Sequence, residues 1–244
     1  MIYGKKYFNH WADTNGSHYK FTEIFISQEA VCQKHKELEE WNVNPLTIRL
    51  CLLQEVFGKL FDARLKIRQK TSNPGYTYHQ SQVAYVSGVT SSMVVTMPGY
   101  MGETFSLDLH EIYKNTYAFC SFFSAVLDRL AFEIHILYKI GNQDIIDWRK
   151  FKNKNGKNGD LFNDLVQKNK MLSDVIFKND FSRILEVRDS FEHGKKMEIS
   201  ATSLNADFDF TIKCDGTENK VVEFFYVQIV NLLNLCENFY KSID

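Results

Sequence analysis

The segment LEVRDSFEHGKK, residues 185–196, contains two side chains whose types and spacing suit chemistry. Arg188 falls on a line of apolar residues, and burying a guanidinium without a partner is energetically expensive. We therefore expect either a carboxylate beside Arg188, a side chain that reaches back to the surface, or a wet hole that accepts an anion. His193 falls on the last turn of the same predicted helix, where the helix end favours a protonated imidazole. Such an imidazole can give or take a proton in catalysis, or it can simply stabilise the helix end.

The helix expected to carry both residues spans about residues 173–193, and Gly194 follows as a left-handed terminator. Its inward line repeats every three or four residues and consists of Phe177, Phe181, Ile184, Arg188 and Phe191. Five residues along an ideal helix correspond to about 140° of rotation, so Arg188 and His193 should not share a face. They can still form one site if the helix loosens at His193, or if a two-fold dimer brings a second copy of the motif alongside.

The sequence RDSFEHG, from Arg188 to Gly194, resembles the R-x4–6-H motif of the HEPN superfamily. These are small helical domains of prokaryotic defence, toxin–antitoxin and RNA-processing systems. As in that superfamily, a polar residue follows the arginine, here Asp189, and a glycine follows the histidine. The resemblance is strict over this short segment and loose over the helical pattern of the rest of the chain.

The resemblance implies a metal-independent endoribonuclease that needs no cofactor and works as a homodimer. RNA carries its own nucleophile, the 2′-OH. His193 would serve as general base toward that hydroxyl or as general acid toward the leaving 5′ oxygen, and the second copy would take the other role. Arg188 would stabilise charge in the phosphorane-like transition state, leaving a 2′,3′-cyclic phosphate. Lys195 and Lys196 would attract the RNA backbone.

One departure from the family pattern concerns Asp189, because asparagine most often stands after the arginine in active members. Together with Glu192, Asp189 places two carboxylates around the predicted site. They can keep His193 protonated and orient Arg188, or they can repel an RNA phosphate. The alternative function is therefore a catalytically silent HEPN-like module that binds RNA, a nucleotide or a partner protein. The resemblance also suggests an antitoxin or a nucleotidyltransferase-like protein as partner. A third possibility is a helical bundle in which the motif is accidental.

A second segment, RLAFEIH, also matches the bare spacing, with Arg129 and His135 at its ends. The apolar Leu130 stands where the family prefers a polar residue. The segment also lies within a predicted helix, with no terminator after His135. We therefore expect Arg188 and His193, rather than this pair, to correspond to the family motif.

The composition of the whole chain is that of an ordinary globular protein. Of 244 residues, 44% are hydrophobic and 14% aromatic, enough for a sizeable core, and the net charge of −1 creates no overall attraction to nucleic acid or an anionic membrane. No signal peptide or membrane-spanning run is evident. A cytoplasmic location is also expected because the cysteines are scattered, odd in number and never in C-x-x-C pairs; they are Cys32, Cys51, Cys120, Cys214 and Cys236.

The spacing of apolar residues predicts an all-α fold, which the resemblance makes an HEPN-like bundle of about five to six helices in a single domain over residues 1–244. Residues 71–108 are rich in Gly, Ser, Thr and Pro and are expected to form a long irregular insertion with β-prone pieces. Residues 197–214 alternate with period two and predict a β-hairpin before the last helix. Helices are expected near 27–41, 45–70, 108–141, 160–170, 173–193 and 217–241, the last begun by a capping box of Asp215 and Glu218.

Overall fold

The fold is known from a computed structural model, which describes the chain in segments. The described residues are 24, 26, 27, 30, 31, 33, 34, 46–71, 81–85, 102–140, 147–149, 159–193, 197–204, 207–214 and 217–243. Within them the protein is mainly helical, and a hairpin precedes the last helix, as the sequence predicts. None of the helices in these segments combines the length and apolar character needed to span a membrane.

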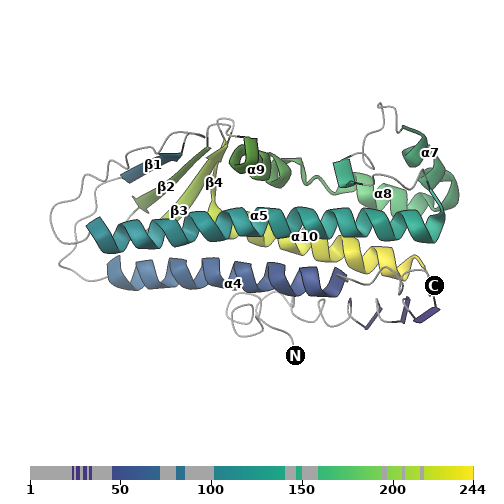
Figure 1. The fold of residues 1–244 in the computed structure, drawn as a ribbon, viewed down its shortest axis with the longest axis horizontal. Helices are drawn as coiled ribbons and strands as arrows, with labels where there is room; N and C mark the ends of the chain where they lie inside the picture. The colour runs from purple at the N-terminus through teal and green to yellow at the C-terminus, as the bar shows by residue number, and fades with distance from the viewer. Residues whose placement is uncertain are drawn as a thin grey trace. The chain divides into compact units, whose positions relative to one another are not determined.

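Six helices have both ends within the described segments (Figure 1): α4 (Leu46–Thr71), α5 (Gly102–Tyr138), α7 (Gly159–Lys168), α8 (Lys170–Lys178), α9 (Ser182–His193) and α10 (Val221–Lys241). The bounds of α4 agree closely with the prediction, whereas α5 begins six residues earlier than expected, at 102 rather than 108. The described residues of the expected first helix, between 24 and 34, are helical, and the remainder of that helix lies outside the described part.

The single helix expected over residues 173–193 is in fact two helices, and the break lies at Asn179. The backbone of Asn179 is extended, with φ −85° and ψ 114°. Its backbone N–H and its side-chain Nδ2 both donate to the carbonyl oxygen of Val175, at 3.3 and 2.9 Å. Asparagine competes in this way with helix continuation, because its side chain supplies a local hydrogen bond to the backbone. Phe177 is therefore on α8, and α9 is a separate short helix that carries Arg188 and His193.

The β-structure forms one antiparallel sheet of four strands in the order β1-β2-β3-β4. The predicted hairpin is formed by β2 (Met197–Leu204) and β3 (Asp207–Cys214), paired from Met197↔Cys214 to Leu204↔Asp207. The strand β4 (Thr217–Lys220) was not predicted from the sequence; it pairs with β3 and leads directly into α10. The expected capping box is therefore wrong, since Glu218 lies in a strand; Asp215 lies outside the described residues.

Part of the segment expected as an irregular insertion is regular. β1 (Ser81–Tyr85) pairs with β2 along its whole length, which agrees with the β-prone sequence there. Residues 102–108 belong to α5. Apart from Thr71, the last residue of α4, the rest of residues 71–108 lies outside the described part.

The chain packs as two compact units. The first comprises Met1–Gln54, Phe122–Phe181 and Ile229–Asp244, and the second comprises Glu55–Ser121 and Ser182–Gln228. The helices α4, α5 and α10 contribute residues to both. The motif helix α9 and the sheet belong to the second unit, where α9 contacts β2 and β3.

The core of the second unit is built around aromatic rings on three helices. Phe119 of α5 stacks on Phe225 of α10, with ring centroids 4.2 Å apart, and Phe57 of α4 packs against Phe119 at 6.1 Å. An ion pair of 2.6 Å joins Arg64 of α4 and Glu223 of α10 in the same unit. Large rings contribute most of the apolar area buried in such a core, so these contacts hold α4, α5 and α10 together within this unit.

The core of the first unit contains an unusual buried charge pair. Glu133 of α5 accepts a hydrogen bond from Nε of Arg129 at 2.9 Å and another from the hydroxyl of Tyr240 on α10 at 2.7 Å. All three side chains are buried. The apolar part of this core includes the edge-to-face contact of Phe123 and Phe181, with centroids 5.3 Å apart.

Candidate functional site

The helix α9 has one buried face and one polar face. Ile184, Leu185, Val187 and Ser190 are buried. The hydroxyl of Ser190 donates to the carbonyl oxygen of Glu186 at 2.8 Å, so it is used within the helix. Arg188 and Asp189 are half-buried, and Glu192 and His193 are exposed. The chemistry-bearing residues therefore lie together on the accessible side of the last turn and a half of α9.

Arg188 is paired with carboxylates of its own helix. Its Nη2 donates to Oδ1 of Asp189 at 3.0 Å, and its Nε lies 3.6 Å from Oε2 of Glu192. Glu192 is four residues further along the helix, a spacing that places side chains on the same face. Of the environments the sequence left open for Arg188, the structure has the carboxylate partner. The side chain of Arg188 keeps 21% of its surface exposed, although its Nε is buried.

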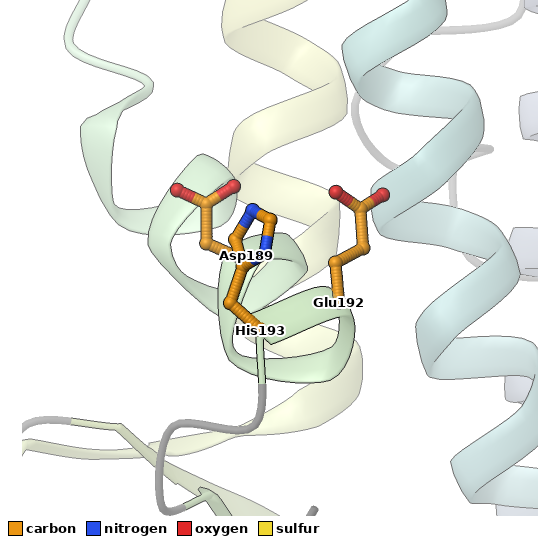
Figure 2. A group of neighbouring side chains, drawn as sticks. All are labelled: Asp189, Glu192 and His193. Atoms are coloured by element: carbon orange, nitrogen blue, oxygen red, sulfur yellow. The ribbon is translucent and has the colours of Figure 1, made fainter.

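His193 completes this cluster at the end of α9. A ring nitrogen of His193 and one carboxylate oxygen each from Asp189 and Glu192 lie within 4.8 Å of one another. Figure 2 shows the imidazole with the two carboxylates on the same side of the helix end. The structure therefore joins Arg188 and His193 indirectly, through the two carboxylates that both of them approach. Lys195 and Lys196, the predicted RNA-binding residues, lie outside the described part of the chain.

The charges of this cluster set what it can do. A carboxylate beside an imidazole can fix the orientation of the ring. Asp189 is placed for that role toward His193, one helical turn away. The two carboxylates outnumber Arg188, so the cluster is net negative whenever His193 is neutral. A phosphate would bind best here if Arg188 turned from Asp189 toward the ligand, because the two carboxylates otherwise repel the phosphate.

The same three side chains can in principle hold a metal ion. Within the described residues, Asp189, Glu192 and His193 form the group whose ligand atoms lie close enough to share one. Imidazole and carboxylate together suit a transition-metal ion. Arg188, however, already pairs with both carboxylates, and a metal would have to displace the guanidinium from them.

The second match to the motif spacing proves to be core structure. Arg129 is buried in its ion pair with Glu133. His135 is buried as well, and its Nδ1 is in hydrogen-bond contact with the carbonyl oxygen of Ile140. Both side chains are therefore part of the core.

Sequence reasoning missed the aromatic surroundings of the cluster. Phe191 of α9 contacts Tyr113 and Tyr117 of α5, with ring centroids 4.8 and 5.2 Å apart. The two tyrosines are four residues apart in the sequence, a spacing that places them on one helix face. The spacing could have indicated that the two tyrosines share a helix face, but only the fold shows that this face contacts α9.

No family model matches the chain, and neither a curated protein nor a solved structure is similar enough to it to count as a match.

Proposed function

We propose that this protein is an HEPN-like endoribonuclease that cleaves RNA through its own 2′-OH, with Arg188 and His193 at a dimeric site. The observation that carries the proposal is the exposed imidazole of His193 at the end of α9, beside the carboxylate that pairs with Arg188. This arrangement offers a proton-transfer group and an anion-binding group at one accessible position. The type of reaction is inferred from the resemblance to the HEPN motif, and the role of each residue is proposed from its contacts.

The proposed reaction needs two proton transfers and one site of charge stabilisation. A neutral His193 takes the proton of the 2′-OH, the 2′ oxygen attacks phosphorus, and the bond from phosphorus to the 5′ oxygen breaks. A protonated His193 of the second copy donates a proton to that leaving oxygen. Arg188 exchanges its bond to Asp189 for bonds to the non-bridging phosphate oxygens, where negative charge accumulates. Asp189 then holds the imidazole in position.

This division of roles requires a homodimer, because a single His193 cannot act as base and as acid in the same step. A two-fold axis near the end of α9 would place two His193 rings on opposite sides of one phosphate. The biological setting that accompanies this proposal is a prokaryotic defence or toxin–antitoxin system in the cytoplasm, with an antitoxin or a nucleotidyltransferase-like protein as partner.

The direct test is cleavage of labelled single-stranded and structured RNA by the purified protein in EDTA. We expect cleavage products that end in a 2′,3′-cyclic phosphate, and no cleavage by the Arg188→Ala/His193→Ala double variant. His110→Ala is the matched control, because it removes an exposed imidazole from α5 of the same unit. Absence of cleavage by the native dimer in every buffer would count against the nuclease.

A second candidate function is the catalytically silent HEPN-like module that binds RNA, a nucleotide or a partner protein. The observation that favours it is the ion pair of Arg188 with Asp189 at 3.0 Å, which occupies the cation that the reaction needs. Binding by such a module would not require that pair to open.

The variant Asp189→Asn separates the two candidates. It removes one negative charge but keeps the shape of the side chain, and asparagine is the residue most often found there in active family members. The amide oxygen of asparagine can still accept a hydrogen bond from the His193 ring. If the ion pair suppresses catalysis, Asp189→Asn is therefore expected to raise the cleavage rate about tenfold or more, equivalent to ~1.4 kcal/mol released from the Arg188 contact. Asp174→Asn, an exposed aspartate on α8, is the control. An inactive native protein and an equally inactive Asp189→Asn variant would support the silent module.

A further inference from the structure

A small cluster of aromatic rings, Tyr113, Tyr117 and Phe191, lies next to the candidate site. Phe191 meets Tyr113 edge-on and Tyr117 at a tilt, with centroids 4.8 and 5.2 Å away. Tyr113 and Phe191 are half-buried, whereas Tyr117 keeps 42% of its surface exposed. All three belong to the second unit. A large ring left open to solvent while its neighbours hold it in place is a preformed surface for another flat group.

The position of this cluster relative to Arg188 suggests what that flat group is. Arg188 precedes Phe191 by three residues on α9, a spacing that brings the two onto one face about 4.5 Å apart along the helix axis. Arg188 can bind a phosphate, and the rings can stack on a base. A nucleotide consists of these two parts, joined by a sugar. A lipid tail or an apolar peptide would pack against the rings but has no anionic group to bind Arg188, which is paired with Asp189.

We propose that Tyr117, supported by Tyr113 and Phe191, stacks on an unpaired base of the RNA next to the phosphate bound by Arg188. This inference rests on the proposed function and specifies its substrate class as single-stranded RNA or an unpaired loop. A base inside a duplex is stacked between its neighbours and cannot offer its face to a side chain. Stacking on an aromatic ring tolerates any base, because every base has a π-face. The rings therefore select unpaired over paired RNA and add little sequence preference.

The test measures binding of a short single-stranded RNA, labelled with a fluorophore and 2′-O-methylated so that it lacks the nucleophile and is not consumed. We expect Tyr117→Leu, which keeps an apolar side chain but loses the ring, to weaken binding about 5- to 150-fold. Tyr117→Phe restores the ring and should restore the affinity. Val227→Ala is the control, because Val227 is 52% exposed on α10 of the same unit. A duplex of the same sequence should bind more weakly and without dependence on Tyr117.

An abasic RNA sharpens the result. Removing the base that stacks on Tyr117 should weaken binding to the native protein as much as Tyr117→Leu does, and should have no further effect on that variant. If native protein binds and cleaves RNA but Tyr117→Leu behaves like Val227→Ala, the stacking surface is refuted and the nuclease stands. Binding that depends on Tyr117 without any cleavage refutes the nuclease and supports the stacking surface. If the native protein does not bind RNA at all, both are refuted.

Discussion

Replacing His193 with alanine is expected to lower the rate of RNA cleavage by about 10²- to 10⁴-fold, the range that general acid–base catalysis commonly supplies. In the proposed dimer both proton transfers pass through this side chain, so the loss should lie near the upper end. Arg188→Ala should lower the rate by a comparable amount, about 10²- to 10³-fold, because it removes charge stabilisation. The quantity to measure is the single-turnover cleavage rate at saturating protein, which separates chemistry from RNA binding.

Mixed dimers show whether both copies contribute a histidine to one site. When native chains are mixed and re-equilibrated with His193→Ala chains, a shared site predicts cleavage that falls with the square of the native fraction. Two independent sites predict a linear fall. A His193→Ala variant that keeps more than about a tenth of the native rate would show that another group moves the protons. His110→Ala should match the native rate, because this exposed imidazole lies on α5 and is not one of the three side chains of the cluster.

Replacing Glu133 with alanine is expected to destabilise the protein by about 3–5 kcal/mol, because it leaves the buried guanidinium of Arg129 without its carboxylate. The side chain of Glu133 is only 1% exposed, so water cannot replace it. The variant also removes the acceptor of the Tyr240 hydroxyl, whose hydrogen bond of 2.7 Å ties α10 to α5 within the first unit. The free energy of unfolding in urea measures the loss.

Replacing both charged residues together tests whether the loss of stability comes from the broken ion pair. Combining Arg129→Met with Glu133→Leu replaces both charges by apolar side chains and should recover most of the stability, because the desolvation cost disappears with the charges. Glu111→Ala is the control on the same helix: its ion pair with Lys114, at 3.1 Å, is exposed and should contribute less than about 1 kcal/mol. A loss below about 1 kcal/mol for Glu133→Ala would mean that Arg129 finds another partner.

The helices were predictable where local periodicity decided the structure, and less so where a single side chain or a distant strand did. α4 and the hairpin of β2 and β3 follow directly from apolar spacing of three or four residues and of two. The break at Asn179 was missed because an apolar line continued across it from Phe177 to Ile184, although the asparagine amide ends α8. β4 was missed because pairing with β3 overrides the helical pattern of Thr217–Lys220.

The candidate residues were chosen from the sequence, whereas their contacts could not be predicted from it. Arg188, Asp189 and His193 stand in the sequence as a recognisable motif, and they meet at the end of α9. Arg188 and His193 both approach Asp189 and Glu192, although five residues separate them along α9. The sequence could not show that Asp189 and Glu192 bridge the two, since rotamers decide that. Nor could it place Tyr113 and Tyr117 beside Phe191, because that contact joins segments about 75 residues apart.

A short connection ties the end of α9 to the first residue of the paired strand β2. Only residues 194–196 separate His193 from Met197, the first residue of β2, and four Cα steps span at most about 15 Å. Met197 is held on both sides, by Cys214 of β3 and by Tyr85 of β1. The length of this connection therefore limits how far the end of α9, which carries His193, can lie from the sheet. An insertion between Leu204 and Asp207 would leave this limit unchanged, whereas a residue gained or lost at 194–196 would change it.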